Sequence, residues 1–334
     1  MNRVRPLPLA AAIGLGAITP SFASFSSAAD SPGNNVTAAS DFRPPQVTAL
    51  ALGRASGGTP GFIKQGGGYF VYANVTADTG NPASGTAAVT ATATNFTAAA
   101  TAVPLVAGAY SAGGVSYTYR SAALTADATL AQGAKPFTVI ATDKALNSAS
   151  LAGSATVDNT APAGADVQTA NAGTNGLAEA GDSLTLIFGE PIEPGSILAG
   201  WAGAPTSVVV RINDNGLVGL PLGNDSVQIW NAANSTLLPL GTVDLGRSDY
   251  VAGLLGGNVR FGASGTSSTM SISGNALTIV LGTYNATPII DPARTTAGGT
   301  GTATWALAAT PYDRAENPMS TATATESGVA DREF

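Results

Sequence analysis

Short stretches in which apolar and polar side chains alternate recur along the chain from residue 46 to residue 157. Successive side chains of a strand point to opposite faces, so this period of two predicts half-buried β-strands. Strands are predicted at residues 46–52, 69–77, 86–93, 102–106, 115–120, 137–142 and 151–157. Clusters of Gly, Asn, Asp and Ser separate them, and no long amphipathic helix lies between them. The pattern predicts an antiparallel β-sandwich and disfavours a parallel α/β sheet.

The alternation continues beyond residue 163, with longer and less regular spacing. Further strands are predicted at residues 207–212, 226–230, 242–245, 269–273, 276–281 and 305–309, with large insertions near 213–224 and 246–265. Gly274 and Asn275 lie between two alternating stretches, which is typical of a tight hairpin. We therefore expect a second, larger β-sandwich in this part of the chain.

Two motifs in the first region carry a family resemblance. Residues 137–147 run from a strand into Asp143-Lys-Ala-Leu-Asn147, a turn in which Asp accepts backbone N–H groups and Asn tolerates the left-handed conformation. Residues 157–162, Val-Asp-Asn-Thr-Ala-Pro, end a strand and lead through proline into the next unit. Together they resemble bacterial immunoglobulin-like repeats of surface and secreted proteins, in which Gly usually stands at the position of Leu146. The resemblance implies a fold and no activity.

A second resemblance begins at Gly176. Residues 176–197 are similar to the start of another bacterial immunoglobulin-like group, in which a strand leads to a one-turn helix, here near 194–198. Asp313-Arg-Ala-Glu-Asn317 then repeats the turn at Asp143. The resulting fold prediction is all-β, with two Ig-like antiparallel β-sandwich domains in tandem at residues 46–158 and 163–325. A linker at 159–162 joins them, and residues 326–334 form a solvated tail.

The amino terminus has the three-part layout of a secretory leader. Arg3 and Arg5 precede an apolar run at residues 9–19, and small residues at Ala23 and Ala29 suit cleavage. The run is too short to span a bilayer, which needs about 20 residues. We expect a signal peptide at 1–29, a flexible lead-in at 30–45, and a secreted or cell-surface product with no membrane insertion after cleavage.

Composition excludes several chemistries. The chain has no His and no Cys, which rules out a Ser-His-Asp triad, a thiolate nucleophile, a disulfide and a His- or Cys-ligated metal. The net charge is −7, and lysine occurs only at Lys64, Lys135 and Lys144. Without a basic patch, nucleic acid is not an expected partner.

Calcium is the metal that the remaining residue types suit, because it binds carboxylate and carbonyl oxygens. Asp143, Asp158, Glu179 and Asp182 are the candidate ligands, and Asp166 and Glu190 are expected near the same ends of the two sandwiches. An acidic junction there would stiffen the pair of domains. The alternative is that these carboxylates only cap turns.

Trp201 is the candidate ligand-binding aromatic. It lies in a Gly-rich loop, Ala-Gly-Trp-Ala-Gly, where we expect its ring to be exposed and able to stack on a sugar. The carboxylates available for glycoside hydrolysis are Glu179, Asp182, Glu190, Glu193 and Asp225. Glu190 and Glu193 lie in a Pro-rich segment, where a structural role in a turn is favoured. No catalytic residue is assigned.

These observations favour a non-catalytic extracellular or cell-surface module with a structural or adhesive role, whose partner is an extracellular glycan or protein. The alternative is a carbohydrate-binding protein of the cell envelope. A glycoside hydrolase with a carboxylate pair ranks third, and calcium is the one cofactor considered.

Overall fold

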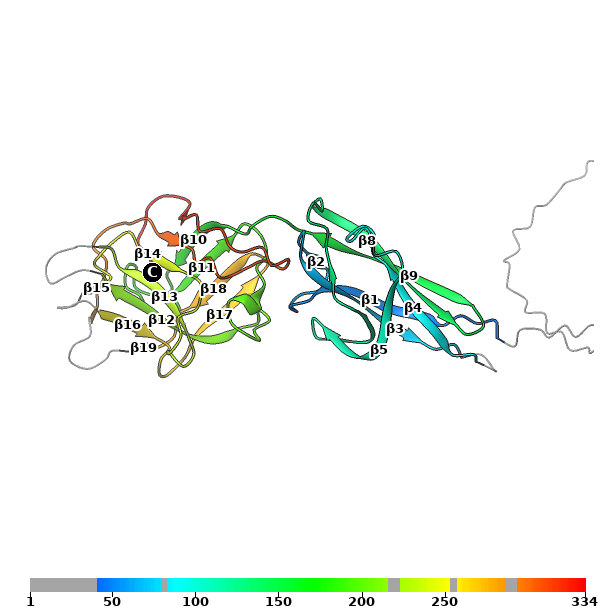
Figure 1. Cartoon of the computed structure of the whole chain (residues 1–334). Coiled ribbons are helices and arrows are strands. Elements are labelled where there is room, and N and C mark those ends of the chain that lie inside the picture. Colours follow the sequence, from blue (N-terminus) through cyan, green and yellow to red (C-terminus); the bar gives the residue numbers. More distant parts are fainter. Residues whose placement is uncertain (1–40, 80–82, 216–222, 253–256, 286–292) are drawn as a thin grey trace, which may run out of the picture. The chain divides into compact units, whose positions relative to one another are not determined.

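The structure is a computed structural model that describes residues 41–79, 83–215, 223–252, 257–285 and 293–334 (Figure 1). The predicted signal peptide, and the predicted lead-in up to residue 40, lie outside these residues. Within the described ranges the chain is all-β and has no α-helix, as the sequence predicts. A search of the same ranges finds no helix long and apolar enough to cross a membrane.

The strands of the first half of the described chain form one continuous sheet, and we call residues 41–158 the first half. Its strands are β1 (Gln46–Arg54), β2 (Phe62–Ile63), β3 (Gly68–Thr76), β4 (Thr86–Thr92), β5 (Val103–Ala112), β6 (Val115–Ser121), β7 (Leu124–Thr125), β8 (Gly133–Asp143) and β9 (Ser148–Val157). All seven predicted strands overlap observed ones, whereas the two-residue strands β2 and β7 are too short to show a period.

Strand order in this sheet is β1-β3-β6-β5-β4-β8-β9-β2, with β7 also beside β3. The pairs are antiparallel except that β2 runs parallel to the end of β9. Strand β5 joins the two layers, because Val103 and Pro104 pair with β4 and the rest of the strand pairs with β6. The layers are thus parts of one curved sheet that nearly closes on itself, and not two separate sheets.

The alternating pattern of β8 builds the core of the first half. Phe137, Val139 and Ala141 point inward at 2% exposure or less, and the same period leaves Asp143 on the buried face at the end of the strand. The Phe96 ring packs against those of Tyr69 and Phe137, with centroids 6.1 and 6.3 Å apart. The period that packs the core therefore also buries a carboxylate.

The second half, residues 159–334, has a larger and less regular sheet. Its elements are β10 (Gly164–Ala170), β11 (Ser183–Phe188), the 3₁₀ turn η1 (Pro194–Ser196), β12 (Thr206–Asp214), β13 (Ser226–Asn231), β14 (Thr242–Asp244), β15 (Val251–Ala252), β16 (Gly257–Phe261), β17 (Ser268–Ser273), β18 (Ala276–Val280), β19 (Tyr284–Asn285), β20 (Ala293–Arg294), β21 (Thr304–Ala306) and β22 (Ala324–Thr325). The predicted one-turn helix is η1. The predicted hairpin is β17–β18, with Ser273 opposite Ala276 and Gly274 at φ +61°.

The main sheet of the second half has the order β10-β11-β18-β17-β12-β13-β14-β21-β22, and β16 and β19 pair beside β12. A small sheet of β15 and β20 accompanies it. Buried apolar residues form a cluster that is separate from the core of the first half. Phe188 and Trp305 meet edge to face at its centre, with ring centroids 5.1 Å apart.

The carboxyl-terminal segment corrects one prediction. Residues 326–334 were expected to be a solvated tail, but Glu333 is fully buried and Phe334 is 1% exposed. The Phe334 ring packs edge to face on Tyr250, with centroids 6.4 Å apart, and its carbonyl accepts a hydrogen bond from Gly176 N. Only the middle of the segment is solvated, so the segment returns to the core at its last two described residues.

Candidate functional site

The two Asp-x-Ala-x-Asn turns are built in the same way. Asp143 Oδ1 accepts a hydrogen bond from Asn147 N at 2.8 Å, and Asp143 Oδ2 accepts one from Asn147 Nδ2 at 2.8 Å. Asp313 accepts the same two groups of Asn317, at 2.8 and 2.7 Å. Both aspartates are fully buried. The two turns therefore share one hydrogen-bonded geometry, which the sequence repeat alone indicated.

The residue before the Asn is in the left-handed conformation in both turns. Leu146 and Glu316 each have a φ of 71°. A left-handed backbone is unfavourable for a residue with a Cβ. This conformation is held in both turns, because the Asp and Asn side chains on either side are hydrogen-bonded to each other.

Each turn also holds the segment that enters its own half. Asn147 Nδ2 donates to the Asp41 carbonyl at 3.1 Å, five residues before β1, and Asn317 Nδ2 donates to the Asp158 carbonyl at 2.9 Å, before β10. We call each set of contacts a clasp. In both halves the clasp fixes the start of the fold to its last turn.

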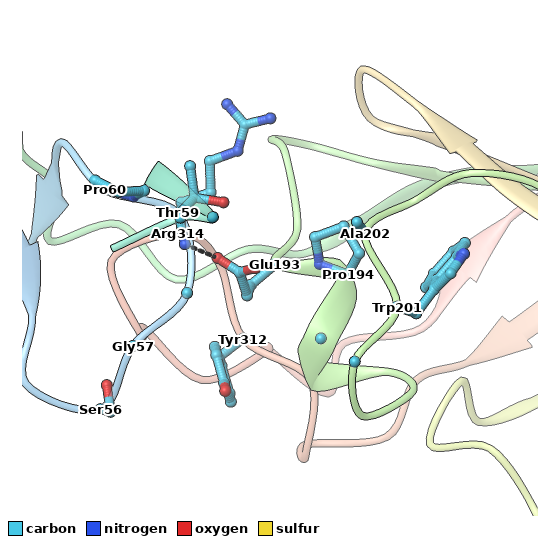
Figure 2. A pocket seen from close by; sticks show the side chains of 15 residues that line it. Ser56, Gly57, Thr59, Pro60, Glu193, Pro194, Trp201, Ala202, Tyr312 and Arg314 are labelled. Atoms are coloured by element: carbon cyan, nitrogen blue, oxygen red, sulfur yellow. Dashed lines mark hydrogen bonds between the residues drawn. The ribbon is translucent and has the colours of Figure 1, made fainter. Parts of the chain in front are cut away.

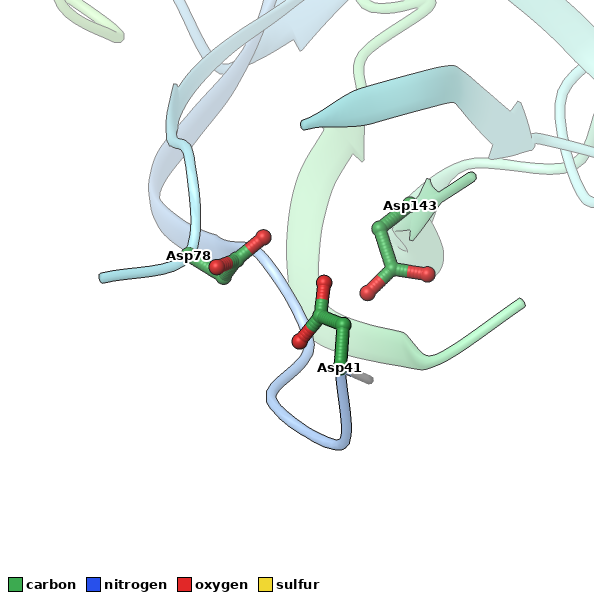
Figure 3. Close-up of side chains that lie close together, drawn as sticks. All are labelled: Asp41, Asp78 and Asp143. Carbon is green, nitrogen blue, oxygen red and sulfur yellow. The ribbon is translucent and has the colours of Figure 1, made fainter. Parts of the chain in front are cut away.

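Acidic side chains gather around each clasp. Carboxylate oxygens of Asp41, Asp78 and Asp143 lie within 4.8 Å of one another, and Figure 3 shows the three side chains on separate segments that converge. At the second clasp the corresponding group is Asp158, Glu190 and Asp313. In each group one acid comes from the entering segment, one follows the second long strand of its half (β3 or β11), and one opens the final turn.

The two groups differ in their electrostatics. Hydrogen bonds from Ser84 and from Arg43 N hold the pKa of Asp41 below its ordinary value. Burial, with the neighbouring charges of Asp158 and Asp313, raises the pKa of Glu190 to about 7. Burial also raises the pKa of Asp313. The second group therefore holds a proton more readily than an exposed set of carboxylates near neutral pH.

The four predicted calcium ligands are not brought together. Asp143 and Asp158 belong to the two different groups, and Glu179 and Asp182 to neither. Asp182 is fully buried, and its carboxylate accepts hydrogen bonds from Ala172 N at 2.8 Å and from Glu179 N at 2.6 Å. Glu179 accepts Thr174 N at 2.7 Å and lies 3.8 Å from Arg294 Nη1. These last two carboxylates cap a turn, which was the alternative to metal binding.

A pocket of about 620 Å³ lies beside the second clasp (Figure 2). It is lined by Ser56, Gly57, Gly58, Thr59, Pro60, Gly113, Gly114, Glu193, Pro194, Gly195, Gly200, Trp201, Ala202, Tyr312 and Arg314. The Glu193 carboxylate accepts Thr59 N at 2.9 Å, the contact drawn in Figure 2. The walls therefore offer hydroxyl, carboxylate and guanidinium groups together with two aromatic rings.

Beside the pocket lies a buried cation. The Arg54 side chain is 3% exposed; Nη2 lies 3.2 Å from Glu193 Oε2 and Nη1 lies 3.2 Å from Glu316 Oε1. Its guanidinium carbon is 5.5 Å from the centroid of the Tyr312 ring. Gly58 is needed here, since a Cβ on it would lie 1.8 Å from Arg54 Nη2. The charge of Arg54 is thus matched by two carboxylates, as buried ions require.

The predicted exposure of Trp201 is wrong. The residue is only 9% exposed, and its indole Nε1 donates to the Ala204 carbonyl at 2.6 Å. The ring packs with the core of the second half and forms part of the pocket wall. The flanking glycines suggested a free loop, but the apolar area of an indole is buried when a neighbouring carbonyl can accept its N–H.

Two carboxylates considered for hydrolysis have structural contacts. Glu193 is paired with Arg54, and Asp225 is fully buried, with Oδ2 accepting Tyr250 N at 2.8 Å and Val251 N at 2.9 Å. Burial raises the pKa of Asp225 to about 7. Asp225 thus positions the backbone at Tyr250 and Val251, and Glu193 positions the buried guanidinium of Arg54.

Sequence reasoning missed several members of these groups. Asp41, Asp78 and Asp313 complete the acidic groups, and Arg54 and Tyr312 complete the surroundings of the pocket. A signal for Asp313 was available, because it occupies the place of Asp143 in the repeated turn. Arg54 gave none, since the charges that match it lie 139 and 262 positions away in the chain.

Comparison with protein-family models, with curated proteins and with solved structures returns no match.

Proposed function

We propose that this chain is an exported, non-catalytic structural or adhesive module made of two immunoglobulin-like domains in tandem. The observation that carries the proposal is the recurrence of the clasp. An Asn side chain from the last turn of each half donates to the carbonyl of the segment that enters that half. A unit that fixes its own entering segment in this way can be repeated along a chain with a defined connection.

The strand orders support the immunoglobulin-like assignment. In the first half, β1-β3-β6-β5 and β4-β8-β9-β2 make two layers, and the short β2 runs parallel to the last strand, β9. Two layers of antiparallel strands with such crossovers are the architecture of immunoglobulin-like sandwiches. In the second half, β10-β11-β18-β17 repeats the order of the first layer.

The polar groups described above support a role without catalysis. The buried carboxylates Asp143, Asp182 and Asp313 accept backbone hydrogen bonds, and Glu193 neutralises Arg54. Groups engaged in this way stabilise the fold, which in turn holds the exposed strands and loops in place. A module of this kind works through its exposed strands and loops.

Location and adhesion test the proposal together. An antibody against the chain should detect it in the medium or on intact source cells, with the first 29 residues or so removed. Protease added to intact cells should remove the surface-bound fraction. Deletion of the gene should reduce attachment to a glycan- or protein-coated surface, and reintroduction should restore it. A product confined to the cytosol with its leader intact would contradict export, and unchanged attachment would contradict the adhesive role.

Carbohydrate binding at the pocket is the second candidate function. The pocket of about 620 Å³ is large enough for a small glycan and combines Arg314, Tyr312 and Ser56. A glycan array should then show hits that Arg314→Ala removes. Arg43→Ala is the matched control, because Arg43 is exposed and lies outside the pocket lining. An array without hits, or equal binding by the Arg314→Ala variant, would exclude this candidate.

A further inference from the structure

Three carboxylates meet where the last described residues return to the core of the second half. Oxygens of Glu326, Asp331 and Glu333 lie within 4.8 Å of one another. Backbone contacts fix the segment that carries them: Glu326 N donates to Ala303 O at 2.9 Å, and Gly301 N donates to Asp331 O at 2.7 Å. The three side chains are thus held together by the sheet and its edge.

Glu333 distinguishes this group from an ordinary cluster of surface acids. The residue is fully buried, and its Oε2 accepts Thr169 Oγ1 at 2.6 Å. Oε1 is buried without a hydrogen-bond donor among the described residues. A buried carboxylate oxygen without a partner is costly, because it has lost water and gained nothing in exchange.

The surroundings do not neutralise these charges. In the part of the chain that the structure describes, the four ion pairs involve Glu193, Glu316, Asp249 and Glu179, and none reaches the three carboxylates. The site therefore needs a positive charge, supplied by a bound cation or by a proton shared between Glu326 and Glu333.

We propose that Glu326, Asp331 and Glu333 bind a calcium ion that fixes residues 326–334 to the second half. Ligands at the usual calcium–oxygen distance of about 2.3–2.6 Å from one ion lie at most about 5 Å apart, which these oxygens satisfy. All three side-chain ligands are carboxylate oxygens, the ligand type that calcium takes in proteins. The remaining positions of the ion are open to water on the exposed side of Asp331.

This site differs from the acidic groups at the clasps, and only its expected affinity rests on the proposed extracellular location. An extracellular module binds calcium with a dissociation constant of about 10⁻⁴–10⁻³ M, so the ion would be bound in calcium-rich surroundings and lost in a chelator. Binding would then order the end of the segment and stabilise the second half, because ligands that bind only the native state raise its stability.

Calcium titration of the full chain by calorimetry, with thermal melts in EDTA and in 5 mM CaCl₂, tests the proposal. We expect binding of calcium to this site and a melting midpoint several degrees higher with the ion. Asp331→Asn should weaken that binding at least tenfold and remove the midpoint shift, and it should fold normally because Asp331 is exposed. Asp127→Asn is the matched control, since it removes one carboxylate outside the three acidic groups and its side-chain oxygen can still accept the hydrogen bond from Ala98 N.

Terbium luminescence gives a second readout that does not depend on stability. Tyr250 Oη accepts Glu333 N at 2.6 Å, so light absorbed by this ring should sensitise terbium at the site. Excess calcium should quench the emission, and Asp331→Asn should abolish that calcium-sensitive part.

Two results would overturn the proposal. Calcium binding that survives Asp331→Asn would place the ion elsewhere. Absence of calcium binding at 5 mM would also overturn it, and a higher melting midpoint in Glu333→Gln would then show that a shared proton neutralises the group.

Discussion

Asn317 is the residue whose substitution should most clearly distinguish the stability of the second half from that of the first. The residue is 8% exposed. Its Nδ2 donates hydrogen bonds both to Asp313 Oδ2 at 2.7 Å and to the Asp158 carbonyl at 2.9 Å. In Asn317→Ala both acceptors lose this donor. Asp313 keeps only the backbone N–H groups of Ala315 and residue 317.

The expected loss follows from the two bonds. A hydrogen bond to a charged group contributes about 1.5–3 kcal/mol and a neutral one about 0.5–1.5 kcal/mol, so Asn317→Ala should lower the free energy of unfolding by about 3 kcal/mol. With a urea dependence of about 2 kcal/mol per M, the unfolding midpoint should fall by about 1.5 M. Asn147→Ala should cost less in the first half, because Asn147 is only half-buried and its bond to the Asp41 carbonyl is longer, at 3.1 Å.

Tryptophan fluorescence makes the assay selective. Trp201, Trp230 and Trp305 all lie in the second half, so urea-induced changes in their emission report on that half, and circular dichroism reports on both. Asn317→Ala should shift the fluorescence midpoint. Asn147→Ala should shift a transition seen by circular dichroism and leave the fluorescence midpoint in place. An Asn317→Ala variant within 0.5 kcal/mol of the wild type would refute the role given to the clasp.

Two further predictions concern buried groups of the second half. Phe334→Ala should lower the free energy of unfolding of that half by about 3–5 kcal/mol, measured by urea unfolding followed by fluorescence. Val329 is 89% exposed, so Val329→Ala should change the same free energy by less than about 0.5 kcal/mol. Equal effects of the two substitutions would contradict the burial of Phe334. The pKa of Asp225 is raised from 3.8 to about 7, so its neutral form is favoured on folding and stability falls as pH rises from about 4 through 7. Asp225→Asn should reduce this fall in melts recorded from pH 4 to pH 8, and an unchanged slope would show that Asp225 is not its source.

The strands and the repeated turn could be predicted because their causes are local. In β8 the period of two decides which side chains face the core, and it buries Asp143 as well as Phe137. The hairpin at Gly274 follows from a residue that tolerates a positive φ between two alternating stretches. The pairing of β5 with both β4 and β6 leaves no such local trace, because the strand changes partners along its length.

The errors at Trp201 and at the end of the chain have one physical origin. Each segment looks solvated because glycine or charged residues surround a single large aromatic. In the fold each aromatic finds a partner far away in the sequence: Phe334 packs on Tyr250, and Trp201 joins the core of the second half. The grouping of Asp313 with Asp158 and Glu190 also depends on contacts across more than 120 residues, so the sequence could identify the acids but not their neighbours.

The second clasp has a mechanical consequence. Strand β9 ends at Val157, and the next residue is the one whose carbonyl Asn317 holds. Tension applied to the connection between β9 and β10 would thus reach the Asp313–Asn317 turn of the second half before it reaches β10. If the chain is stretched in its natural setting, the hydrogen bond between Asn317 and the Asp158 carbonyl would break first and would re-form after release, while the sheet of the second half stays intact.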